Sequence, residues 1–234
     1  MANSSIYNTL NNIKKNKING INGLFDLLYL KKTFLLQTFG NLIFQILITF
    51  IIAFHIKTDI FEKNIISYIA IFIISFVIII VMAVVPMPPI LKFLLFCIFS
   101  ALIGLILSVI KNKTSTSIIK SAILSVLAIY IIMFMLGITL LLFNIKLGFK
   151  TGIFLLSLLF ILIITSIIFQ FMKQYKTYHK IFAILTILLF SAYIVYDTNI
   201  ILQKDYFGDF ITASLDYYLD IINIFINLIS LQSE

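Results

Sequence analysis

The chain has 234 residues, of which 62% are hydrophobic and only 11% are charged. A soluble domain carries about 25% charged residues, and a globule of this size could not bury so much apolar side chain. Composition therefore excludes a soluble globular domain, a disordered chain and a nucleic-acid-binding protein, and it predicts the lipid bilayer as the surrounding medium. The net charge of +8 comes from lysines, since arginine is absent, and these lysines lie between apolar runs as in membrane-protein loops.

Residues 1–33 are predicted to be a polar N-terminal tail rich in Asn and Lys, without a signal peptide. Within this tail we expect a short amphipathic helix at 21–30. Residues 34–234 are predicted to be a single transmembrane domain, because the breaks between their apolar runs are too short to hold a second one.

A bilayer's hydrocarbon core is crossed by about 20 helical residues. Seven runs of about this length follow the tail: 34–54, 65–85, 93–110, 121–143, 152–172, 181–202 and 210–231. Backbone in lipid must satisfy its own hydrogen bonds, so continuous runs of this length indicate helices rather than barrel strands. The predicted fold is all-α, a polytopic bundle of seven transmembrane helices.

The orientation of the bundle is predicted from its lysines. Lys31 and Lys32 directly precede the first span, and charges at that position favour a cytosolic N-terminus. Seven full crossings then place the C-terminus on the opposite side. If the last segment is re-entrant instead, both ends lie on the cytosolic side.

Only three charged residues lie inside the predicted spans: Asp197, Asp216 and Asp220. A charged group near the bilayer centre costs about 3 kcal/mol or more, so such residues usually mark a functional site. Two purely structural roles are the alternatives. Asp216 would extend toward the interface at its helix N-terminus, or the aspartates would only hold the bundle together.

The last span carries a polar stripe. Asp216, Asp220, Asn223 and Asn227 recur at i, i+4, i+7 and i+11, which places them on one side of a helix. Such a stripe should face other helices or a water-filled path, and it predicts a central position for helix 7. The alternative is that the two Asn only form hydrogen bonds between helices.

A short turn brings the last two spans together as an antiparallel pair. With the turn centred on Tyr206, Asp197 lies nearest in depth to Asp216, while Asp220 is one turn deeper, about 6 Å. A shift in the turn favours either partner. Two carboxylates that meet in a site of low dielectric cannot both ionise cheaply, so they can share a proton. When ionised, the pair offers hard oxygen ligands to a cation such as Ca²⁺.

Two stretches resemble the C-terminal signature of the Bax inhibitor-1 family, which includes the Lifeguard and Golgi anti-apoptotic proteins. The first is 191–202, which contains Tyr196-Asp197-Thr198, and the second is 217–227, which contains Leu219-Asp220-Ile221-Ile222-Asn223. Weaker resemblance at Lys32-Thr33-Phe34, Gln45 and Thr49 extends the match toward the first span.

The resemblance implies a seven-helix bundle with helix 7 at its centre in the ER or Golgi membrane. It implies a pH-sensitive Ca²⁺ leak and suppression of cell death, with membrane apoptosis regulators as candidate partners. Asp197 and Asp220 match the family's paired aspartates, which favours Asp220 over Asp216 as the partner and makes Asp197 and Asp220 the tentative Ca²⁺ ligands. Tyr196, Thr198, Asn223 and Asn227 would support the ion and proton site. No cofactor is expected, since Ca²⁺ and protons would be transported or regulatory ions.

Three departures from the family pattern bear on this expectation. Some members place an Arg in helix 2 against the aspartates, and this chain has no Arg. Asp216 stands where the family usually has Asn, and the acid of helix 3 is missing near Ile103.

Two other functions compete with a leak channel. A non-conducting protein would suppress death by binding membrane partners. An intramembrane aspartyl protease would need a second aspartate in a Gly-x-Gly-Asp motif, whereas the chain has Tyr206-Phe-Gly-Asp209 in a loop. We therefore expect no enzyme activity.

Overall fold

The computed structural model describes residues 20–56, 65–170, 175–204 and 206–233. All regular elements within these ranges are helical, which confirms the predicted all-α class. In chain order they are α2 (Gly20–Leu30), α3 (Lys32–His55), α5 (Ile65–Val84), α6 (Pro89–Asn112), α7 (Thr116–Leu142), α8 (Phe149–Gln170), α9 (Tyr175–Gln203), the 3₁₀ turn η1 (Tyr206–Gly208) and α10 (Phe210–Gln232).

Six of these helices are long and apolar enough to cross a membrane, namely α3, α6, α7, α8, α9 and α10. Each overlaps a predicted span and extends it by a few residues at one or both ends. α5 has 20 residues, lies within the predicted run 65–85 and contains the apolar segment Ile69–Val84, but it is not among these six candidate spans. The described residues thus contain six candidate spans, and the seventh crossing stays a prediction.

Local signals in the sequence explain where several of these helices begin. α6 starts at Pro89, whose missing N–H costs nothing in the first turn of a helix. α7 starts after Ser115, which accepts a hydrogen bond from the amide of Ile118, and α10 starts after Asp209, which accepts one from the amide of Thr212. These caps place the helix ends next to the loops in which the lysines are concentrated.

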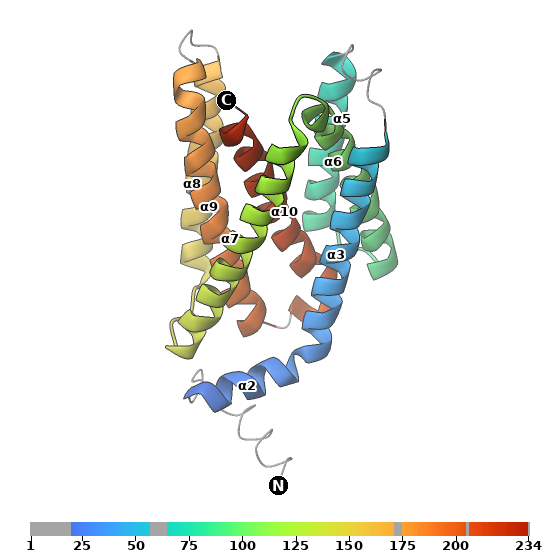
Figure 1. The fold of residues 1–234 in the computed structure, drawn as a ribbon. Coiled ribbons are helices and arrows are strands. Elements are labelled where there is room, and N and C mark those ends of the chain that lie inside the picture. Colours follow the sequence, from blue (N-terminus) through green and yellow to red (C-terminus); the bar gives the residue numbers. More distant parts are fainter. Residues whose placement is uncertain (1–19, 57–64, 171–174, 205, 234) are drawn as a thin grey trace.

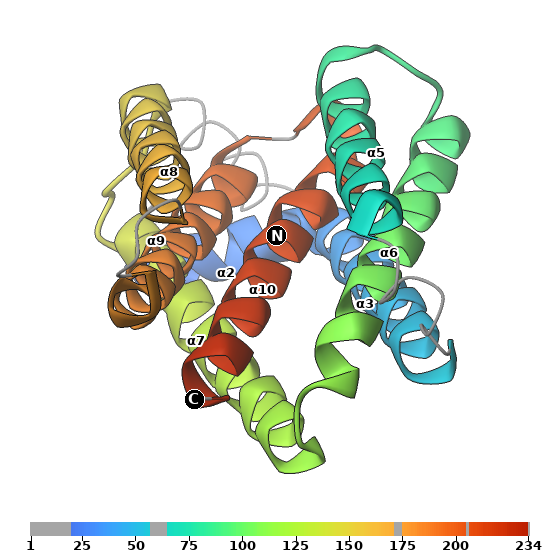
Figure 2. The same cartoon turned by 90° about the horizontal axis from the view of Figure 1, so that it is seen from above.

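α10 packs against α3, α6, α7 and α9, while α5 packs on α6 and α8 packs on α9. Seen from above, α10 runs through the middle of the group, with α8 and α9 on one side and α3, α5 and α6 on the other (Figure 2). The outer helices expose large apolar side chains, as at Phe72 and Phe154. An apolar surface of this kind is suited to lipid rather than water.

Tyrosines and phenylalanines fill the space around α10. Tyr217 and Tyr218 are fully buried on two sides of this helix. Tyr217 packs against Tyr130 of α7 with ring centroids 5.5 Å apart, and Tyr218 packs edge-on against Phe96 of α6 at 5.2 Å. Such edge-to-face pairs favour one relative orientation of the helices, so α10 is held on both sides by aromatic contacts.

α2 lies across the lower end of the bundle, beside the ends of α7 and α9 (Figure 1). Its Leu24 and Leu27 are buried with Leu141 of α7 and Leu202 of α9. The expected helix at 21–30 is therefore present. Residues 1–19 of the predicted tail lie outside the described residues, and α3 begins at Lys32.

Candidate functional site

Asp197 and Asp220 come together on the facing sides of α9 and α10. Both side chains are buried, with 8% and 3% exposure, and their carboxyl groups are close enough to share a hydrogen bond. Two carboxyl groups can share such a bond only when one of them carries a proton. Of the two partners that the turn geometry left open for Asp197, the structure brings Asp220 into contact.

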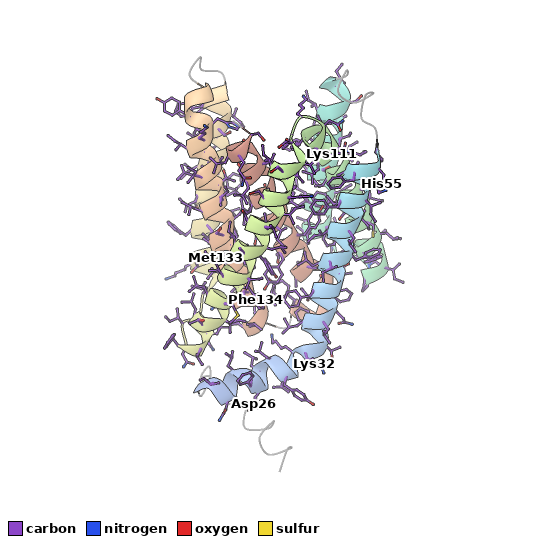
Figure 3. All side chains as sticks on the ribbon, viewed as in Figure 1. Asp26, Lys32, His55, Lys111, Met133 and Phe134 are labelled. Carbon is purple, nitrogen blue, oxygen red and sulfur yellow. The ribbon has the colours of Figure 1, made fainter. Side chains whose placement is uncertain are left out.

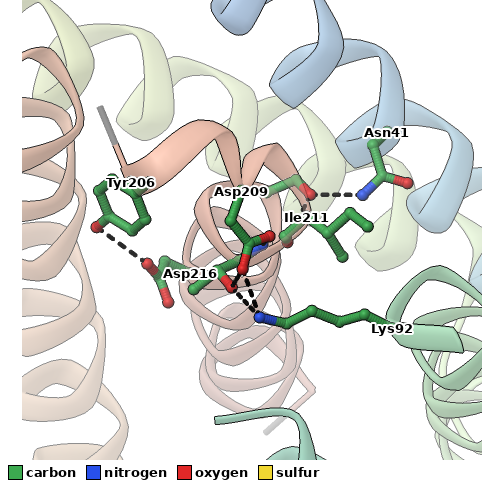
Figure 4. A network of polar contacts seen from close by, with 8 residues as sticks. Asn41, Lys92, Tyr206, Asp209, Ile211 and Asp216 are labelled. Carbon is green, nitrogen blue, oxygen red and sulfur yellow. Dashed lines mark hydrogen bonds and ion pairs between the residues drawn. The ribbon is translucent and has the colours of Figure 1, made fainter. Parts of the chain in front are cut away.

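Asp216 lies one turn closer to the loop and is less buried than Asp220. One of its carboxylate oxygens, Oδ2, accepts a hydrogen bond of 3.3 Å from the hydroxyl of Tyr206 in η1 (Figure 4). Burial, and then the charge of Asp216, raises the pKa of Tyr206 above its ordinary value, so this hydroxyl keeps its proton and acts as the donor. Asp216 thus has its own partner at the loop end of the site.

A cavity of about 880 Å³ connects these aspartates. Lys204, Asp209 and Thr212 line it near the η1 turn, and Asp197 and Asp220 line it near mid-span. The other lining residues are Tyr193, Tyr196, Tyr206, Asp216, Leu159, Phe190, Ile200 and Leu219. Four carboxyl groups therefore follow one another from the helix ends into the bundle.

Two buried oxygens near the aspartate pair have no hydrogen-bond partner within the described residues. They are Oδ2 of Asp220 and the hydroxyl of Tyr130. Tyr130, on α7, lies within electrostatic reach of both Asp197 and Asp220. Because a buried polar group without a partner costs about 1–3 kcal/mol, this place is suited to a water molecule, a proton or a cation.

The predicted supporting residues divide into two groups. Thr198 is fully buried and accepts a hydrogen bond of 3.0 Å from the hydroxyl of Tyr217, and Tyr196 lines the cavity. Asn223 and Asn227 instead donate to backbone carbonyls of their own helix, at Leu219 and Asn223, over 2.7 and 2.8 Å. The two amides thus lie on α10 beyond the residues that line the cavity.

At its loop end the cavity borders an ion pair between α6 and α10. Nζ of Lys92 lies 2.5 Å from Oδ2 of Asp209 and also donates to the hydroxyl of Thr212 (Figure 4). Burial acts to raise the pKa of Asp209, but hydrogen bonds from Lys92 and Thr212 outweigh it and hold that pKa below its usual value. Asp209, which the protease alternative would need as a reacting acid, is thus an ionised helix cap.

A family model described as inhibitor of apoptosis-promoting Bax1 matches residues 31–233, nearly the whole chain. The chain belongs to this family. The protein LIFEGUARD 1 of Arabidopsis thaliana is 37% identical over 46 residues, and LIFEGUARD 2 of the same plant is 40% identical over 43 residues. These matches cover 20% and 18% of the chain, and the chain covers the same shares of the two relatives.

Family membership and the apolar helices together make this Bax inhibitor family member an integral membrane protein. Membership is also consistent with an anti-apoptotic role. The expected resemblance is therefore confirmed for the family and for the membrane. The channel activity, its pH dependence and the compartment are proposals, argued below.

Three further polar residues of this family member escaped the sequence analysis as site residues. Asn199 is fully buried, accepts a hydrogen bond from the amide of Leu147, and donates to the carbonyls of Gly137 and Ile145. Lys31 is buried and donates to the carbonyls of Ile201 and Lys204 at the end of α9. Lys92 was assigned to an aqueous break. Asn199, two residues after Asp197 in a membrane span, is the one whose polarity was a usable signal.

Within the described residues, no three His, Cys, Asp or Glu side chains form a group that could hold a metal ion. Asp197 and Asp220 have four carboxyl oxygens between them, so they could supply at most four of the six to eight oxygens that Ca²⁺ takes. The donor set is therefore suited to an ion that keeps much of its water, and not to a tightly held resident ion.

Proposed function

We propose that this Bax inhibitor family member suppresses cell death as a pH-sensitive Ca²⁺ leak channel of the ER or Golgi membrane. The observation that carries the proposal is the meeting of Asp197 and Asp220 in a cavity lined by two further aspartates. The role makes and breaks no covalent bonds, so the protein is proposed to be no enzyme.

The pH dependence follows from the proton that the pair shares. When the pair loses this proton, two buried negative charges face each other, and their repulsion falls if a cation enters or the helices separate. The unpartnered Oδ2 of Asp220 offers the first oxygen to such a cation. Asp209 and Asp216, nearer the loop, would concentrate cations before they reach the pair.

The bundle is proposed to cross the membrane seven times, with α5 as the second crossing and α10 as its central helix. A cytosolic N-terminus would put the loop end of the cavity, which lies near α2, on the cytosolic side. The glycosylation acceptor Asn112-Lys113-Thr114, at the end of α6, should then be modified in the lumen. An unmodified acceptor there, with modification of one in the N-terminal tail, would contradict this orientation.

The described conformation fits a closed state of the proposed channel. A second, much smaller cavity of about 10 Å³ lies at the other end of the bundle, lined by residues that include Phe50, Lys111 and Phe225. No residue lines both cavities. We propose that α10 moves between Asp220 and Phe225 when the channel conducts.

The same discontinuity favours the second candidate, a non-conducting protein that suppresses death by binding membrane apoptosis regulators. The Asp197→Asn/Asp220→Asn variant distinguishes the two proposed functions, and Asp26→Asn, outside the cavity, is the matched control. A channel mechanism predicts that the folded double variant neither leaks Ca²⁺ from its compartment nor protects cells, while the control does both. Full protection by a double variant that leaks nothing would favour the binding mechanism.

A further inference from the structure

α2 has two apolar faces, and the bundle covers only one of them. Leu24, Leu27 and Leu28 pack against α7, α9 and the start of α3. Ile21, Phe25 and Tyr29 recur at i, i+4 and i+8 along a second stripe and are 62%, 64% and 71% exposed. Successive helical residues are about 100° apart, so this stripe lies about a quarter turn from the buried face.

The position of α2 fixes which environment this stripe meets. α3 crosses the membrane from Lys32, and its Leu36, Phe44 and Leu47 are exposed where lipid surrounds the bundle. α2 ends two residues before that crossing starts and lies across the end of the bundle, with Asp26 on the side facing away from it (Figure 3). The exposed stripe therefore lies next to the start of the α3 crossing, where we expect the membrane interface.

Lys31 prevents α2 and α3 from separating freely from the bundle. Its ammonium group is buried and donates to the carbonyls of Ile201 and Lys204, over 3.0 and 2.6 Å. A cation at these carbonyls also complements the negative end of the α9 dipole. The elbow between α2 and α3 is thereby tied to the end of α9, and the angle of α2 is defined by the bundle itself.

The charge of the N-terminal sequence favours one kind of lipid. Besides the buried Lys31, the first 33 residues contain Lys14, Lys15, Lys17 and Lys32 against a single acid, Asp26. Each basic residue near an anionic leaflet adds about 1 kcal/mol of attraction. An amphipathic helix with aromatic and aliphatic residues on one side and lysines beside it is typical of interfacial anchors.

We propose that α2 is an interfacial anchor, which inserts Ile21, Phe25 and Tyr29 among the headgroups and upper acyl chains of an anionic leaflet. The anchor is independent of ion conduction. It would hold the end of α9, and with it the loop end of the cavity, at a fixed depth in the membrane.

The test uses the full chain in lipid vesicles, with Cys97→Ser as the background and one environment-sensitive fluorophore per variant. Labels at Ile21→Cys, Phe25→Cys and Tyr29→Cys report the stripe, and labels at Gly23→Cys and Asp26→Cys are matched controls on another side of the same helix. Vesicles contain acyl chains brominated near the headgroup, with phosphatidylcholine alone or with added phosphatidylserine.

The proposal predicts several-fold stronger quenching by brominated lipid at the three stripe positions than at the two controls. Added phosphatidylserine should strengthen the quenching of the stripe labels. The triple variant Lys14→Gln/Lys15→Gln/Lys17→Gln should cancel this increase in quenching. Equal quenching at all five positions, or stripe labels reached by an aqueous quencher, would overturn it. Stripe labels hidden from both quenchers would overturn it too, because they would show that a protein partner or a second copy covers the stripe.

Discussion

Asp220 holds one carboxylate oxygen in the interior without a partner, while its neighbours along the cavity are satisfied. Asp216 accepts from Tyr206, and Asp209 is bound by Lys92 and Thr212. The carboxyl groups near the loop end of the cavity thus have hydrogen-bond partners, while Asp220, deeper in the bundle, has an oxygen without one. At the residue scale, this difference separates the acids that hold the structure from the pair that is available to a proton or an ion.

The Lys92–Asp209 pair gives a prediction for stability. Asp209→Asn removes the ion pair and weakens the cap of α10, and it should lower the free energy of unfolding by about 1 kcal/mol at neutral pH. The pKa of Asp209 lies below its ordinary value, so the stabilisation is complete above that ordinary value, about 3.9, and is lost as the pH falls through the lowered pKa.

Denaturation in detergent, from neutral to acidic pH, measures this difference. The unfolding curves of wild type and Asp209→Asn should converge at acidic pH. Equal stability of Asp209→Asn and wild type at neutral pH would show that the pair contributes nothing.

At the element scale, α9 is positioned beside α10 by close approach to α7. Gly137 of α7 leaves no room for a side chain, since a Cβ there would lie 2.7 Å from Cβ of Thr198 and 2.9 Å from the carbonyl oxygen of Val195. Asn199 reinforces the contact by donating to the carbonyl of Gly137. The helix that carries Asp197 is thus held by one glycine and one buried amide.

Gly137→Ala should therefore push α7 and α9 apart. We expect a loss of about 1–3 kcal/mol of stability, the usual cost of overpacking, together with altered exposure of Asp197. Gly40→Ala is the matched control, because nothing lies within 4 Å of a Cβ at that helical position. Thermal unfolding of both variants in detergent measures the effect, and equal stability would contradict the packing argument.

Residue spacing predicted the elements better than it predicted their contacts. Apolar runs located the six candidate spans to within a few residues, and the i, i+4 stripe placed Asp216 and Asp220 on one side of α10. Lys31 and Lys92 were missed because their partners lie 170 and 117 residues away in the chain. Such pairs depend on how helices pack, which local periodicity does not encode.

At the scale of the whole molecule, positive and negative charges lie at different depths along the bundle. The lysines lie at helix ends and in the breaks between spans, as at the start of α6, while Asp197, Asp216 and Asp220 lie within α9 and α10. The overall basic character therefore describes the aqueous ends of this family member. The proposed ion site uses the few charges of opposite sign inside the bundle.

The pH profile of Ca²⁺ release from liposomes tests the central claim most directly. Wild type and Asp26→Asn should release Ca²⁺ with a rate that changes with pH. Asp197→Asn/Asp220→Asn, with its helical content intact, should show no pH dependence, because amides cannot exchange the shared proton. An unchanged pH profile in the double variant would contradict the assignment of Asp197 and Asp220 as the proton and ion site.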